Sequence, residues 1–315
     1  MESIKVFDRP ASQSFYSVAG RLLFIESINL ELRNLIVDRF AGWQLTPVSL
    51  PDRSPDIQIS FSCEALPQRI PRHLDRFEIA EGGKCYTDGA GLYLELGGPV
   101  VHLENGGVVS VKVSFTELPR LGEPLFGRAA SFAVCAALRR YGLFDLHSAG
   151  MIEPESGAGV LIIGPSGSGK STLALQLAQA GWSYLSDDEL LLSLRDGVVE
   201  ARGFRSFFAV RAATAQFRHC FEPETVFESK RVQQAFPKSL YFIGLNDESR
   251  SNLSKLTQAE TMQRLIRACP WATYDTSVAG ANLELLSTLA RQARGFDLSA
   301  GRDLLDPGFA ASFLK

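Results

Sequence analysis

A chain of 315 residues is long for one hydrophobic core, so two domains are expected. Its content of 45% hydrophobic and 21% charged residues is typical of a globular protein and excludes a largely disordered chain. The formal net charge of -3, without a long basic run, argues against nucleic acid or an anionic membrane as the partner.

No segment has the roughly 18 uninterrupted apolar residues that a membrane helix needs. Residues 1–15 lack an apolar stretch followed by a small-residue cleavage site, so no signal peptide is predicted. The 5 cysteines are scattered without CxxC spacing, which predicts reduced thiols rather than a disulfide or zinc framework. These features predict a cytoplasmic protein.

The first part of the chain alternates apolar and polar residues as half-buried strands do, around one segment with helical spacing. It predicts a small α+β domain with an antiparallel sheet over residues 1–120. The predicted helix is 30–40, and the predicted strands are 14–25, 56–61, 76–86, 90–97 and 107–115.

A helix over 122–141 is predicted to follow, so the second domain is expected to span 121–315. The rest of the pattern predicts an α/β arrangement with two hairpins, the second around the Asp196-Gly197 turn. The predicted strands are 143–152, 158–164, 183–194 and 198–204, and the predicted helices are 171–181, 257–268 and 281–293.

A glycine-rich segment between the strand 158–164 and the helix 171–181 matches G-x-x-x-x-G-K-[ST]. Its glycines allow backbone N–H groups to surround a polyphosphate, Lys170 can reach the β- and γ-phosphates, and the Ser171 hydroxyl can ligate Mg²⁺. The helix that follows adds the positive end of its dipole. The segment predicts ATP binding by Gly164, Pro165, Ser166, Gly167, Ser168, Gly169, Lys170, Ser171 and Thr172.

Asp187 and Asp188 follow Lys170 by seventeen and eighteen positions, at or near the end of a predicted strand that should lie close to the loop. Neighbours on a strand point to opposite faces, so one carboxylate can serve the metal or its water shell while the other takes a proton from an attacking hydroxyl. A solvated acidic turn is the alternative, and the apolar flanks of the pair make it the weaker interpretation. His147, Glu200 and Arg202 have no decisive role on sequence physics alone.

The segment from His147 to Leu192, with Glu200-Ala201-Arg202-Gly203 after it, resembles the catalytic domain of the HPr kinase/phosphorylase family. In that family a histidine precedes the phosphate loop by one hairpin, an Asp-Asp pair follows the loop helix, and a Glu-x-Arg-Gly segment comes later. The resemblance covers about residues 141–212 and is faint over 236–305. It implies a fold shared with phosphoenolpyruvate carboxykinase.

The resemblance implies that Asp187 is the base that accepts the proton of a serine-type hydroxyl, with help from His147. It places Mg²⁺ near Ser171, Asp188 and Glu200, and it makes Arg202 a candidate for stabilising the phosphate. Lys230, Arg231 and Lys238 are the candidates for a later arginine that acts on the transferring phosphoryl.

The chain also departs from the family pattern. Arg205 stands where a second glycine is usual, and residues 1–120 do not resemble the usual regulatory domain. HPr is therefore in doubt as the acceptor, and so is the reverse phosphorylase reaction. The sequence predicts an ATP- and Mg²⁺-dependent serine-type kinase acting on a small protein or peptide; a homo-oligomer is left open.

Two alternatives belong to other classes. A carboxykinase-like enzyme acting on a small acid would need a second metal site, and only one of the 4 histidines, His147, stands next to the loop. A nucleotide-binding regulatory module without transfer would not need the acidic residue at position 187.

Overall fold

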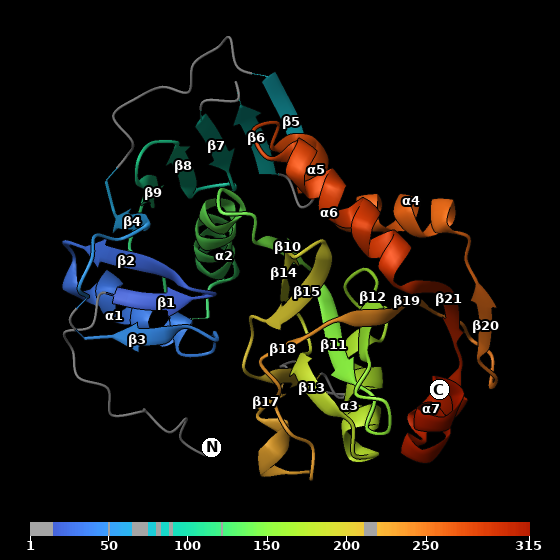
Figure 1. Cartoon of the computed structure of the whole chain (residues 1–315). Helices are drawn as coiled ribbons and strands as arrows, with labels where there is room; N and C mark the ends of the chain where they lie inside the picture. Colours follow the sequence, from blue (N-terminus) through green and yellow to red (C-terminus); the bar gives the residue numbers. More distant parts are fainter. Residues whose placement is uncertain are drawn as a thin grey trace.

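The computed structural model describes residues 15–49, 51–64, 75–79, 83–87, 91–120, 122–210 and 219–315. These residues form a mixed α/β structure in which a nine-stranded sheet lies beside a group of smaller sheets (Figure 1). Helix α2 stands between the two parts (Figure 1). Among the described helices, none is long and apolar enough to span a bilayer.

The nine-stranded sheet has the order β3-β1-β2-β4-β9-β8-β7-β6-β5. It is mixed rather than antiparallel as predicted, because β4 pairs in parallel with both β2 and β9. The β2–β4 pair is parallel because the chain crosses over through α1 and β3 between these two strands, and β5 to β8 separate β4 from β9 along the chain. The strands are β1 (Phe15–Val18), β2 (Arg21–Ser27), β3 (Thr46–Val48), β4 (Ile57–Ser62), β5 (Asp75–Ile79), β6 (Gly83–Thr87), β7 (Gly91–Glu95), β8 (Val100–Glu104) and β9 (Val109–Ser114).

Two helices cover this sheet. Helix α1 (Leu30–Phe40) begins at an Asn29 cap whose side chain accepts from the Leu32 N–H, and its buried face belongs to the core of the sheet. Helix α2 (Pro124–Arg139) contributes its alanine-rich buried face to the same core. Both helices are confirmed, whereas the domain boundary between residues 120 and 121 stays a prediction.

The second part is built on a six-stranded sheet of order β13-β11-β12-β19-β21-β20. Strand β12 lies in its middle and is buried on both faces, with Val160 and Ile162 in the core under α3 and Leu161 and Ile163 in the core under α6. A strand buried on both sides reads as a continuous apolar run rather than an alternation. The strands are β11 (Ser148–Ile152), β12 (Gly159–Ile163), β13 (Ser183–Ser186), β19 (Pro237–Leu245), β20 (Asn252–Lys255) and β21 (Arg294–Ala300).

Smaller sheets and helices complete this part. A four-stranded sheet has the order β10-β14-β15-β18, and β16 pairs with β17. These strands are β10 (Phe144–Leu146), β14 (Leu190–Arg195), β15 (Val198–Gly203), β16 (Phe208–Val210), β17 (His219–Phe221) and β18 (Gln234–Ala235). The helices are α3 (Lys170–Gln179), α4 (Gln258–Ala268), α5 (Trp271–Tyr274), α6 (Ala279–Gln292) and α7 (Pro307–Phe313).

Several predicted strands are divided in the structure. The predicted strand 14–25 is the hairpin β1–β2, turning at Ala19 and Gly20 with positive φ, and 76–86 contains β5 and β6. The predicted strands 143–152 and 183–194 each split into two strands that belong to different sheets. The apolar pattern does not indicate these divisions, because each of the resulting strands has buried apolar residues.

The segment Gly42–Gln44 joins the two parts by pairing with residues 204–206. The Gln44 N–H donates to the Phe204 carbonyl at 3.0 Å, and the Ser206 N–H donates to the Gly42 carbonyl at 3.0 Å. The Arg205 guanidinium lies over the Trp43 ring, 4.6 Å from the ring centroid. Arg205 therefore fixes the contact at the position where the resembling family has glycine.

Replacing Arg205 with methionine is expected to lower the free energy of unfolding by about 2 to 3 kcal/mol, since it leaves the Glu189 carboxylate buried without its cation. Urea denaturation measures this loss. The control Arg76→Met removes an exposed ion pair with Glu78 and should cost less than about 1 kcal/mol. Equal losses in the two variants would contradict the conclusion that Arg205 compensates the charge of a buried Glu189. Adding Glu189→Gln to Arg205→Met should restore part of the stability, because it removes the uncompensated charge.

Candidate functional site

The topology of the six-stranded sheet brings Gly164, His147 and Asp187 to one end of its strands. Strands β12, β19 and β21 are parallel, so the segment after β12 lies at the edge formed by their carboxyl ends. Strand β11 is antiparallel to β12 and starts at this edge, and β13 is antiparallel to β11 and ends there. His147, just before β11, and Asp187, just after β13, therefore reach the same edge as Gly164.

The segment Gly164–Gly169 is a tight loop that needs its glycines. A Cβ on Gly164 would lie 2.7 Å from the Ile243 carbonyl oxygen, and Gly167 and Gly169 have φ of 84° and 95°. The buried Lys170 Nζ donates to the carbonyl oxygens of Gly164 at 2.8 Å and Pro165 at 3.0 Å. The Lys170 side chain thus folds back across the loop that precedes it.

Helix α3 begins at Lys170 rather than at Ser171, with Gly169 as its cap. No side chain caps this end, and the first turn of a helix leaves backbone N–H groups without partners inside the helix. Such groups, with the positive end of the helix dipole, favour a phosphate. The loop and the start of α3 have the geometry that the sequence motif predicts, while the binding of ATP stays a prediction.

Asp187 comes directly after β13, in the link to β14, and therefore lies near the end of a strand as predicted. Its side chain is 1% exposed, and its Oδ2 accepts a hydrogen bond from the Ala209 N–H at 2.8 Å. Burial raises the pKa of Asp187 to about 7, and the neighbouring charge of Asp188 also raises it. Hydrogen bonds from the Ala209 N–H and the Ser171 hydroxyl lower the pKa of Asp187 and so oppose this shift. Asp187 thus faces the loop serine and has a pKa suited to proton transfer near neutrality.

Asp188 is in a different environment from its neighbour. Its side chain is 34% exposed, and its Oδ1 lies 3.3 Å from His147 Nδ1. The Asp188 carbonyl oxygen accepts a hydrogen bond from the Ser148 N–H at 3.1 Å. This bond connects the β13–β14 link to the start of β11. The structure therefore brings His147 to Asp188, whereas the resemblance implies that His147 assists Asp187.

Glu189, which the sequence analysis did not single out, is the third carboxylate of the same link. It accepts from Arg205 Nε at 2.9 Å and from the Cys135 thiol at 3.3 Å. Burial raises its pKa, which Arg205 opposes. Glu189, Cys135 and Asp145 also come close enough together to suggest a metal site. Because Arg205 neutralises Glu189 and Arg139 neutralises Asp145, this cluster is already compensated by cations.

Glu200 and Arg202 lie on β15, in the four-stranded sheet. Glu200 is buried, with its Oε1 2.5 Å from Arg202 and its Oε2 3.4 Å from Arg195. The structure thus gives Glu200 two arginine partners, and it places Ser171 beside Asp187 instead. The assignment of Glu200 to Mg²⁺ and that of Arg202 to a phosphate stay predictions.

The three candidates for the later cation lie in different places. Lys238 is near the amino end of β19, at the edge opposite to the loop. The Lys230 carbonyl accepts from the Tyr184 N–H at 2.9 Å, and the following Arg231 lies against β13. All three side chains are exposed, and none is assigned to the phosphoryl group by its contacts.

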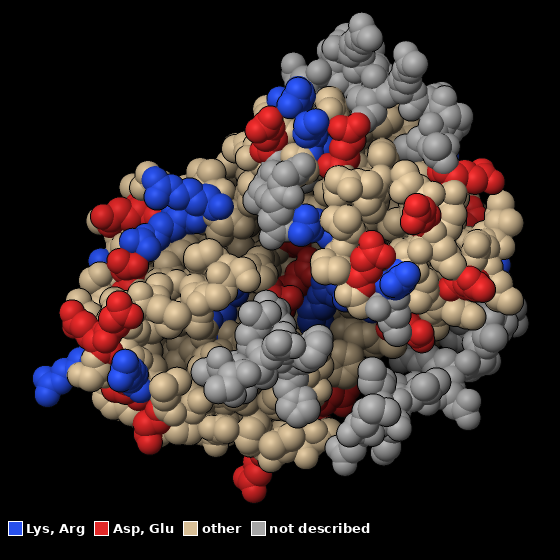
Figure 2. Space-filling view, turned by 180° about the vertical axis from the view of Figure 1, so that it is seen from behind, with Lys and Arg blue, Asp and Glu red and all other residues tan. Residues whose placement is uncertain are grey.

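The face of the molecule that is seen from behind has both signs of charge. Figure 2 shows basic and acidic side chains intermixed over the face seen from behind, with both signs also in its recessed centre. This face has no broad area of one sign.

Comparisons with known proteins add little. No family model matches the chain, and no curated protein matches it. Among solved structures, the Hpr(Ser) kinase/phosphatase from Coxiella burnetii is 17% identical, with a TM-score of 0.28 over 36% of this chain and 77% of that one. A likeness at this level does not establish a shared fold or activity.

The raised pKa of Asp187 predicts a pH dependence of stability. The folded state holds the proton more tightly than the unfolded chain, whose aspartate titrates near 4, so stability falls as the pH rises from about 4 to about 7. Asp187→Asn removes this group, and the variant should gain up to about 4 kcal/mol relative to the wild type between these limits. Urea denaturation at pH 5 and pH 8, without Mg²⁺ or nucleotide, measures the difference. Parallel losses in both proteins would contradict burial of an ionisable carboxyl here.

Proposed function

We propose that the protein is an ATP-dependent phosphotransferase that transfers a phosphoryl group to a serine-type hydroxyl of a small protein or peptide. The observation that carries the proposal is the buried Asp187 carboxyl, with a pKa of about 7, next to the first-turn serine of a phosphate-loop motif. A nucleotide-binding module has no need of such a group. The proposal keeps the kinase prediction and its cofactors, ATP and Mg²⁺.

The loop residues would hold the polyphosphate. The backbone N–H groups of the loop, of which Pro165 has none, and the Lys170 ammonium would provide the donors. Lys170 would exchange its two carbonyl partners for phosphate oxygens. Ser171 and Asp188 offer the hard oxygen ligands that Mg²⁺ prefers, and the buried Oδ1 of Asp187, which accepts no hydrogen bond among the described residues, adds a further oxygen nearby. A bound Mg²⁺ would neutralise charge on the phosphates.

Asp187 is the residue suited to accept the hydroxyl proton. Its Oδ2 is held by the Ala209 N–H, so the carboxyl is fixed in direction, and its pKa allows it to take a proton near pH 7 and release it afterwards. His147 would position Asp188 through their 3.3 Å contact, rather than act on the hydroxyl itself. Positioning and charge neutralisation would supply most of the rate enhancement.

Two substitutions test the proposal. Lys170→Met should weaken the binding of Mg-ATP at least about tenfold, because it removes the one loop cation. Asp187→Asn should leave nucleotide affinity nearly unchanged and lower phosphoryl transfer by about 10²- to 10³-fold. Binding is measured with a fluorescent nucleotide, and transfer is measured with γ-labelled ATP and an extract of small proteins and peptides.

The control is Lys238→Met, the same substitution at the opposite edge of the sheet, which should change neither quantity. Nucleotide binding that survives Lys170→Met would overturn the assignment of the loop. Binding of ATP by the wild type without any label transferred to serine would instead favour a regulatory module and end the kinase proposal.

A further inference from the structure

A cavity of about 380 Å³ lies between the nine-stranded sheet and the second part of the chain. The β1–β2 hairpin, Ala41 and the Trp43–Thr46 segment form one wall. The other wall consists of Leu191, Arg202, Gly203, Ser206, Phe207, Glu222, Arg231 and Gln233. Its volume is within the range of pockets that hold small organic ligands. None of the residues of the phosphate-loop motif lines it.

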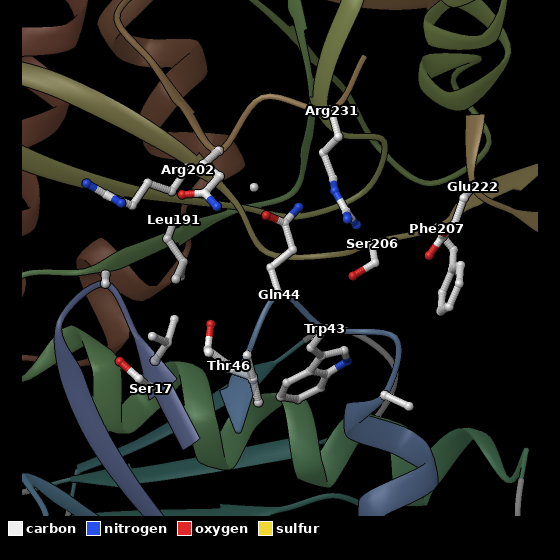
Figure 3. A pocket seen from close by; sticks show the side chains of 16 residues that line it. Ser17, Trp43, Gln44, Thr46, Leu191, Arg202, Ser206, Phe207, Glu222 and Arg231 are labelled. Carbon is white, nitrogen blue, oxygen red and sulfur yellow. The ribbon is translucent and has the colours of Figure 1, made fainter. Parts of the chain in front are cut away.

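Arg231 is the cation that this cavity offers to a ligand. Figure 3 shows its guanidinium end pointing toward the Gln44 amide and the Ser206 hydroxyl across the cavity. Its ion pair with Glu224 is loose, at 3.8 Å. Arg202 also lines the cavity, but its guanidinium is paired with Glu200 at 2.5 Å. An incoming anion is therefore expected to bind to Arg231, whose fork of donors matches a carboxylate.

Hydrogen-bond acceptors lie on the other walls. Gln44 uses its Nε2 to donate to the carbonyl oxygens of Leu185 at 2.9 Å and Arg205 at 3.0 Å, which leaves its Oε1 as an acceptor. Glu222 is half-buried at the cavity wall and has no ion-pair partner among the residues that the structure describes. A ligand that fits this arrangement has an anionic end and a group that donates hydrogen bonds.

We propose that the cavity binds an amino-acid-like ligand, with its carboxylate on Arg231 and its ammonium directed to Glu222. A nucleotide or another polyphosphate fits less well, because several negative charges would face Glu222 while the cavity offers them mainly Arg231, which is loosely paired with Glu224. Serine and glutamine side chains around the two charged ends supply further polar contacts, as in pockets where a few polar groups orient the ligand. This site is separate from the nucleotide and does not depend on the proposed kinase activity.

The test measures binding without nucleotide. The probes are the common free amino acids and the dipeptide Ser-Glu, each added at about 5 mM while the thermal midpoint is followed, since a ligand that binds only the folded state raises it. At least one probe should stabilise the wild type, and calorimetry then gives its Kd. Arg231→Gln should weaken that Kd at least about tenfold, equivalent to about 1.4 kcal/mol.

Glu222→Gln should weaken the same probe, but not its N-acetyl derivative, which lacks the ammonium. The control Arg291→Gln changes an exposed arginine that, among the described residues, donates hydrogen bonds to Ser287 and Thr288 on its own helix. This variant should leave the Kd unchanged. Midpoints without ligand show whether each variant is folded. The proposal is overturned if no probe stabilises the protein, if Arg231→Gln binds normally, or if inorganic phosphate alone binds as tightly.

Discussion

Three consecutive carboxylates lie where the chain leaves the six-stranded sheet and enters the four-stranded one. Burying several negative charges in one short link is costly unless each has its own partner. Asp187 accepts the Ala209 N–H, Asp188 lies beside His147, and Glu189 is paired with Arg205. These partners come from two segments of the chain, residue 147 and residues 205–209, so the environment of the link depends on both.

This requirement connects the nine-stranded sheet to the site. Arg205 neutralises Glu189 while it stacks on Trp43, and Gln44 donates to the carbonyl of Leu185, two residues before Asp187. Arg39 of helix α1 adds to this network: burial and the charge of Arg205 lower its pKa, and the charges of Glu189 and Asp188 oppose this shift. The first part of the chain therefore supports the position of the acidic link.

The sequence predicted what depends on local pattern. The helices at 30–40 and 257–268 carry their own periodicity and caps, and the loop with its flanking strand and helix is a contiguous motif. It did not predict that 143–152 and 183–194 cross between sheets, because an apolar run looks the same whichever sheet pairs with it. The roles of Arg205 and Glu189 were missed for a related reason: their contacts join residues far apart in the chain, which no local spacing reveals.

The crossing also explains how two adjacent aspartates differ. Within one regular strand, their environments would be set by the two faces of a single sheet. At the junction, Asp187 points into the space between α3 and β16, where burial raises its pKa, while Asp188 stays partly open to solvent beside His147. A carboxyl that must accept a proton near neutrality needs desolvation, and one that is to meet a hydrated cation needs access to water. The change of sheet supplies both environments within one peptide unit, so the division of labour proposed for the pair would depend on the junction and not on strand alternation.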